Sequence, residues 1–102
     1  MLVVNRFRAQ DESFRDALTE AHAALAERPG YVDGTIGRNL DDPELWTLVT
    51  RWADVGSYRR ALSAYEVKLT AVPTLSRAID EPSAFEVVEP GGVLNQQDAR
   101  SL

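Results

Sequence analysis

The chain contains no cysteine and only one histidine among its 102 residues. Without cysteine it can form no disulfide, no thiolate nucleophile and no cysteine-bound zinc or iron–sulfur centre. A single histidine cannot make a metal site alone, and the sequence has no nucleotide-binding glycine loop, nucleophile elbow or cluster of metal ligands. Kinase, dehydrogenase, serine hydrolase and metallohydrolase functions therefore lose their usual support, and any chemistry is expected to be poor in cofactors.

Long apolar runs and an excess of basic residues are also missing. No apolar stretch approaches the roughly 20 residues needed to cross a bilayer. The formal net charge of −5 would repel nucleic-acid phosphates. The N-terminal MLVVNRFR lacks the basic segment and long apolar stretch of a secretory signal. We therefore expect neither a membrane nor a nucleic acid as a partner and, by default, a cytoplasmic location.

The composition itself, 44% hydrophobic and 26% charged, is ordinary for a soluble globular protein. A chain of this length suits one small domain that buries roughly 60 to 68% of its unfolded surface, so an oligomer would add apolar burial. The sequence predicts one domain over residues 1–90. Residues 91–102 are polar and lack a period, which predicts a mobile tail.

A strand followed by a helix is predicted at the start of the chain. Residues 2–8 alternate, and Asn5 lies between Val3 and Phe7 on one face. Residues at helical spacing then predict an amphipathic helix that ends at Pro29-Gly30. Its apolar positions are Phe14, Ala17, Leu18, Ala21 and Leu25.

An antiparallel hairpin is predicted next. Residues 31–39 favour a strand in which Gly34 and Gly37 indicate a bulge, a bend or a close backbone approach. The turn residues 41–44 connect it to a strand over 45–52. One face of that strand carries Trp46, Leu48, Thr50 and Trp52, and the other carries Leu45, Thr47, Val49 and Arg51. Since both faces are largely apolar and helices can cover only one, we expect the second to be covered by another subunit in a homodimer.

The second half of the chain repeats the pattern. Helical spacing predicts a helix over about 55–71, with Asp54 as its cap and Pro73 limiting its end. Its apolar positions are Tyr58, Ala61, Leu62, Tyr65, Leu69 and Val72. A short helical turn within 74–80 and a strand over 83–89 follow. The order βαββαβ predicts an α+β, ferredoxin-like fold with an antiparallel sheet, in which Phe14 and Phe85 belong to the core.

Three short segments resemble the antibiotic biosynthesis monooxygenase (ABM) family of the dimeric α/β-barrel superfamily. They are Asn5-Arg6-Phe7, Pro29-Gly30-Tyr31 and the strand that ends in Trp52, and the resemblance covers roughly residues 2–89. It implies a dimeric, ferredoxin-like domain. Members that oxidise polyketide anthrones use an Asn, a Trp four residues later and a Tyr six residues after that. Trp52 and Tyr58 match the last two positions, whereas Leu48 replaces the Asn.

The resemblance implies oxygenation of a small aromatic quinol or anthrone by O2 without a bound cofactor. Asn5, Trp52 and Tyr58 are the predicted catalytic residues, because amide, indole and phenol groups can donate hydrogen bonds to a developing anion. Each also has a structural interpretation. Asn5 could satisfy neighbouring backbone groups, and Trp52 could simply anchor the core.

Further residues are predicted to line a substrate cavity: His22, Tyr31, Leu48 and Tyr65. His22 lies at the edge of the first helix's apolar face, where it could act as a base or remain a partly exposed structural residue. Arg59 and Arg60 follow Tyr58 and could meet an anionic substrate or only solvent. No metal ligands are predicted.

Three other functions stay open at this point. Haem-degrading relatives add a Trp and a His from the second helical region, but these positions fall near Arg60 and Thr70, so the imidazole that would bind iron is missing. A noncatalytic module of the same fold could bind a small hydrophobic metabolite or serve as an accessory protein. The dimer could also be a protein-interaction unit.

Overall fold

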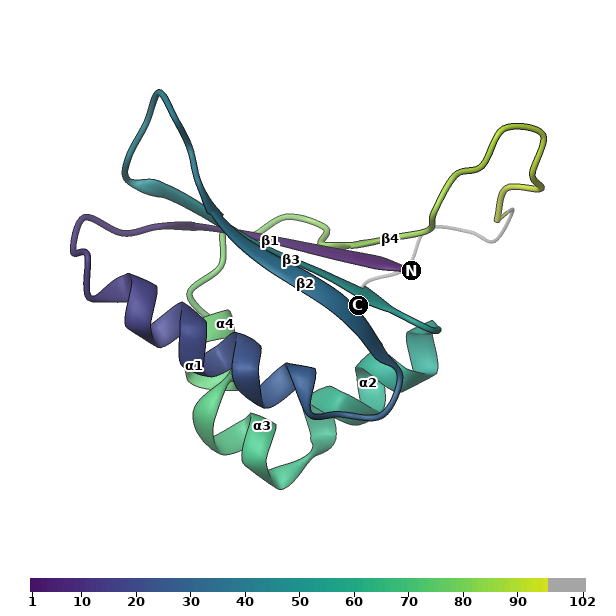
Figure 1. The fold of residues 1–102 in the computed structure, drawn as a ribbon, viewed down its shortest axis with the longest axis horizontal. Helices are drawn as coiled ribbons and strands as arrows, with labels where there is room; N and C mark the ends of the chain where they lie inside the picture. The colour runs from purple at the N-terminus through teal and green to yellow at the C-terminus, as the bar shows by residue number, and fades with distance from the viewer. Residues whose placement is uncertain (96–102) are drawn as a thin grey trace.

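A computed structural model describes residues 1–95 as one antiparallel sheet with helices packed on one of its faces (Figure 1). The strands are β1 (Leu2–Arg8), β2 (Tyr31–Arg38), β3 (Leu45–Trp52) and β4 (Ala84–Phe85), in the spatial order β2-β3-β1-β4. The helices are α1 (Phe14–Ala26), α2 (Val55–Ser63), α3 (Tyr65–Thr70) and α4 (Val72–Leu75). The predicted α+β, ferredoxin-like fold is confirmed. Most of the predicted tail, residues 91–102, lies outside the described residues.

The core lies between α1 and the covered face of the sheet. Every second residue of β3, from Trp46 to Trp52, is buried there, as the alternation predicts. Val3 and Phe7 of β1 face the same layer, and α1 contributes Phe14, Leu18, Ala21 and Leu25. These positions confirm the predicted apolar faces of β1, β3 and α1.

The second helical region is broken where one continuous helix over 55–71 was predicted. Ala64 separates α2 from α3 with an extended backbone, φ −69° and ψ 140°. The break changes the helical phase, so that Val67 and Ala71 are buried while Tyr65 and Leu69 are exposed. Pro73 does not end a helix but lies in the first turn of α4, where its missing N–H costs no intrahelical hydrogen bond.

The last strand is shorter than the predicted 83–89. Phe85 pairs with Leu2, the first residue of the antiparallel β1, so residues beyond Phe85 run past the end of their pairing partner. The core prediction for Phe85 is also wrong for the protomer, because 47% of this residue is exposed on the sheet face opposite the helices.

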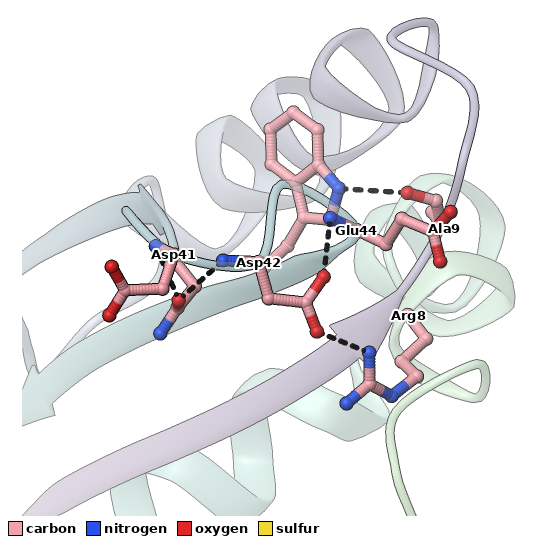
Figure 2. Close-up of polar contacts among 7 residues, drawn as sticks. Arg8, Ala9, Asp41, Asp42 and Glu44 are labelled. Carbon is pink, nitrogen blue, oxygen red and sulfur yellow. Dashed lines mark hydrogen bonds and ion pairs between the residues drawn. The ribbon is translucent and has the colours of Figure 1, made fainter.

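The hairpin turn between β2 and β3 is fixed to the end of β1 (Figure 2). The Asp42 carboxylate accepts hydrogen bonds from the backbone N–H of Glu44 at 3.1 Å and from the Arg8 guanidinium at 2.8 Å. The Trp46 indole N–H donates to the Ala9 carbonyl at 3.2 Å. The predicted hairpin is confirmed, and one of its carboxylates, that of Asp42, is structural.

Candidate functional site

The three predicted catalytic side chains lie in one part of the structure, with Tyr58 between the other two. Asn5 comes from the middle of β1, between the buried Val3 and Phe7. Tyr58 comes from the first turns of α2, and the Asn5 side chain is close enough to its phenol to lower the phenol pKa. The rings of Tyr58 and Trp52 lie 5.4 Å apart between centroids. A strand, a helix and a strand end therefore converge on one cluster, Asn5–Tyr58–Trp52.

Burial raises the pKa of the Tyr58 phenol above its ordinary value, and the hydrogen bond from Asn5 opposes this rise. Tyr58 is therefore a neutral phenol at physiological pH, and its own O–H is available to donate to a further acceptor.

This arrangement makes a prediction for titration. Replacing Asn5 by leucine is expected to raise the pKa of Tyr58 further, because the hydrogen bond that stabilises its phenolate is lost while burial remains. The check is an ultraviolet titration of tyrosinate in the wild type and Asn5→Leu, each compared with its Tyr58→Phe counterpart. An unchanged or lower Tyr58 pKa in Asn5→Leu would show that the amide does not donate to this oxygen.

The Trp52 indole is a core residue in the structure. It is 2% exposed, and its N–H donates to the buried Thr50 hydroxyl at 2.8 Å. The expected free N–H donor is thus already used within the protein, which fits the structural interpretation of Trp52. Within the cluster its ring packs against that of Tyr58.

A second hydrogen-bonded pair adjoins Trp52 from the other side. His22 Nε2 on α1 and the Tyr31 hydroxyl lie 2.6 Å apart, and the Tyr31 ring meets Trp52 edge-on at 5.5 Å. A bulge between Tyr31 and Asp33 keeps Tyr31 on the covered face. The structure thus brings His22 and Tyr31 together between helix and sheet, where each is the hydrogen-bond partner of the other.

Gly34 provides the room for that pair. A Cβ at this position would lie 2.6 Å from His22 Nε2 and 2.9 Å from the Tyr31 hydroxyl. The close backbone approach that the strand glycines predicted is confirmed at Gly34. The bulge lies earlier in the strand, between Tyr31 and Asp33.

The other two predicted lining residues are placed differently. Leu48 is fully buried and pairs with Asn5 across β1 and β3, so it belongs to the core beneath the cluster. Tyr65 is 76% exposed at the start of α3, away from the cluster, because the break at Ala64 turns it outward. The structure does not support Tyr65 as a lining residue.

A pocket of about 120 Å³ opens beside Tyr58. Its lining residues are Met1, Val55, Tyr58, Arg59, Leu62 and Ser83. Sequence reasoning missed four of these and also Thr50, the partner of Trp52. Thr50 could have been noticed in the sequence as a polar residue on the apolar face of β3. The pocket residues come from segments that are far apart in the sequence, so no residue spacing relates them.

The described residues offer no alternative centre for metal chemistry. No group of three or more His, Asp or Glu side chains within residues 1–95 is arranged to hold a metal ion. In the same part of the chain, none of the helices has the length and apolar character to span a membrane.

Comparison with solved structures finds the same fold in an oxygenase. The chain superposes on SnoaB, a cofactor-independent oxygenase from Streptomyces nogalater, with a TM-score of 0.74 and 23% identity over 87% of this chain and 93% of that one. A mutant of SnoaB gives a TM-score of 0.67 and 25% identity over 76% and 82% of the two chains. A conserved protein from Methanosarcina mazei Go1 gives 0.64 and 22%, over 81% and 84%.

One sequence comparison agrees with the structural ones and another finds nothing. No functionally curated protein matches the sequence significantly. The family profile described as antibiotic biosynthesis monooxygenase matches residues 1–71, which contain β1 to α3 and the whole Asn5–Tyr58–Trp52 cluster. The chain therefore belongs to the antibiotic biosynthesis monooxygenase family.

Proposed function

We propose that this protein is a cofactor-independent monooxygenase that oxidises a small aromatic quinol-like or anthrone-like metabolite with O2. The observation that carries the proposal is the cluster of Asn5 and Trp52 around Tyr58, beside a pocket that Tyr58 itself lines. Membership of the family and the common fold with a cofactor-independent oxygenase support it.

Such a reaction needs little from the protein. In an anthrone, loss of a methylene proton gives a delocalised anion that transfers electrons to O2. One oxygen atom becomes the new carbonyl and the other leaves as water, so the four electrons taken from the methylene carbon balance the reduction of O2. The protein has to bind the substrate, exclude water and stabilise the oxyanion.

The cluster provides groups for these tasks. Tyr58, kept neutral by burial, donates its O–H to the aryloxide or peroxide oxygen. The Asn5 amide orients that phenol, and the buried Trp52 ring packs against the Tyr58 ring and fixes its position.

The direct test is oxygen uptake by the purified protein, first checked to be free of metal and flavin, across a panel of hydroquinones and anthrones. Uptake above the spontaneous rate, with a quinone product of the expected mass, is the expected result. Uptake at the spontaneous rate across the whole panel would count against oxygenation of these classes.

A noncatalytic binding module is the second candidate function. It is favoured by the buried Leu48, which stands where the anthrone-oxidising relatives have an Asn, and by the indole N–H of Trp52 that is already bonded. This candidate predicts saturable binding of an aromatic ligand without oxygen uptake.

We also propose that the protein is a homodimer formed through the sheet face opposite the helices, here called the open face. Figure 1 shows helices on only one side of the sheet. The apolar residues of the open face are Leu2, Val4, Leu45, Val49 and Phe85. Its charged groups are already paired within the protomer, as Arg6 with Glu81 at 2.7 Å and Arg51 with Asp33 at 2.8 Å. A second copy could therefore cover this face without burying unpaired charge.

A charge on the open face is expected to separate the subunits. Val49 lies opposite Val4 and Thr35 in the two neighbouring strands, so Val49→Asp places a carboxylate in the middle of the apolar surface. Sedimentation at micromolar concentration should show a dimer for the wild type and a monomer for Val49→Asp. Leu69→Asp, on the helical side, is the matched control and should remain dimeric. A monomeric wild type would contradict the dimer.

A further inference from the structure

The pocket beside Tyr58, here called the Tyr58 pocket, has an uneven distribution of charge. The side chains of Met1, Val55 and Leu62 make its walls apolar, Ser83 adds a polar group, and Arg59 provides a side-chain cation. The Met1 ammonium is a second cation, but it donates to the Trp52 carbonyl at 3.1 Å. The pocket lining contains no carboxylate. A guanidinium at the edge of an apolar pocket forms strong, geometrically specific contacts with a carboxylate, because two N–H groups can donate in parallel.

Arg59 is free to make such a contact. Within residues 1–95 it takes part in no ion pair, whereas its neighbour Arg60 lies 4.0 Å from Asp54 and donates to the Ser57 hydroxyl at 3.3 Å. The two adjacent arginines thus differ in their surroundings. The Arg60 side chain contacts Asp54 and Ser57 at the N-terminal end of α2, whereas Arg59 lines the pocket that contains Tyr58. Because the chain carries a net charge of −5, an anion would depend on this local cation.

We propose that the Tyr58 pocket binds the carboxylate end of an acidic aromatic substrate, with Arg59 as the residue that determines this specificity. The inference rests on the proposed function for the placement of Tyr58 at the reacting ring. The volume of about 120 Å³ is well below the roughly 300 to 1,000 Å³ of pockets that enclose whole drug-sized ligands, so the pocket holds one end of a substrate. The substrate class is then a quinol or anthrone that bears a carboxylate.

The experiment measures binding without turnover. Anthraquinone-2-carboxylate and its neutral carboxamide are planar aromatic probes that cannot be oxygenated at the anthrone position. Their affinities for the full-length protein are measured by calorimetry in the wild type, Arg59→Gln and Arg60→Gln. We expect the wild type to bind the carboxylate about tenfold more tightly than the carboxamide, as for a charge-assisted pair. Arg59→Gln should remove this preference, and Arg60→Gln should keep it.

The outcomes separate this inference from the oxygenase proposal. Equal affinity for both probes, no binding of either, or an equal loss in Arg60→Gln would overturn the assignment of Arg59. A preference that depends on Arg59, in a protein without oxygen uptake on acidic or neutral anthrones, would keep the carboxylate site and refute the oxygenase. Uptake of neutral and acidic anthrones with the same KM, both in the wild type and in Arg59→Gln, would keep the oxygenase and refute the carboxylate site.

Discussion

Oxygen uptake on an active substrate is expected to fall by a factor of roughly 100 to 1,000 in Tyr58→Phe, the range found when one oxyanion donor is removed. The phenylalanine keeps the ring against Trp52 and removes only the hydroxyl that donates to the developing anion. The loss should appear in kcat more than in KM, because the hydrogen bond strengthens in the transition state. Initial rates at saturating O2 give both constants.

Asn5 acts through Tyr58 in this scheme, so the two substitutions should not be additive. Asn5→Leu alone is expected to lower kcat, and the double variant Asn5→Leu/Tyr58→Phe should be little worse than Tyr58→Phe. Tyr65→Phe makes the same chemical change at an exposed position and should leave the rate unaltered. Multiplicative losses in the double variant would show that Asn5 contacts the substrate independently, and full activity in it would remove both residues from the site.

Replacing Gly30 by alanine is expected to lower the free energy of unfolding by about 2 to 5 kcal/mol, the combined cost of a left-handed backbone and of overpacking. Gly30 has φ +89°, and a Cβ there would lie 2.3 Å from both Cβ and Oγ of Ser57. Its carbonyl also accepts a hydrogen bond from Ala53 at 2.7 Å. The turn before β2 is thus packed on the start of α2, the helix that carries Tyr58, and cannot move away easily. Denaturant unfolding measures the effect.

Gly91 offers a matched control for this prediction. It also has a positive φ, +75°, but no atom lies within 4 Å of a Cβ built there. Gly91→Ala should therefore cost much less than Gly30→Ala. The double variant Gly30→Ala/Ser57→Gly removes the steric clash and should recover part of the lost stability, even though glycine within a helix costs about 1 kcal/mol. Equal effects of the two alanine variants would assign the whole cost to the backbone angle.

The sequence alone determined the elements whose periodicity is strong. The period-2 alternation of β3 and the helical spacing of α1 are local consequences of which residues must meet the core, so they predicted the buried faces, the hairpin and the βαββαβ order. The same alternation predicted that Asn5 faces the covered layer with Val3 and Phe7. Trp52 and Tyr58, which match two positions of the anthrone-oxidising family members, are also neighbours in space.

Only the tertiary structure decided the features that depend on pairing between distant segments. The break at Ala64 follows from burying Val67 and Ala71, and it turns Tyr65 outward although its spacing matches the apolar face of a continuous helix. The length of β4 is set by where β1 begins, since a strand can extend only as far as its partner. The approach of Asn5 to Tyr58 joins residues 53 positions apart by numbering, and the Tyr58 pocket joins α2 to Ser83. No local sequence period reveals either of them.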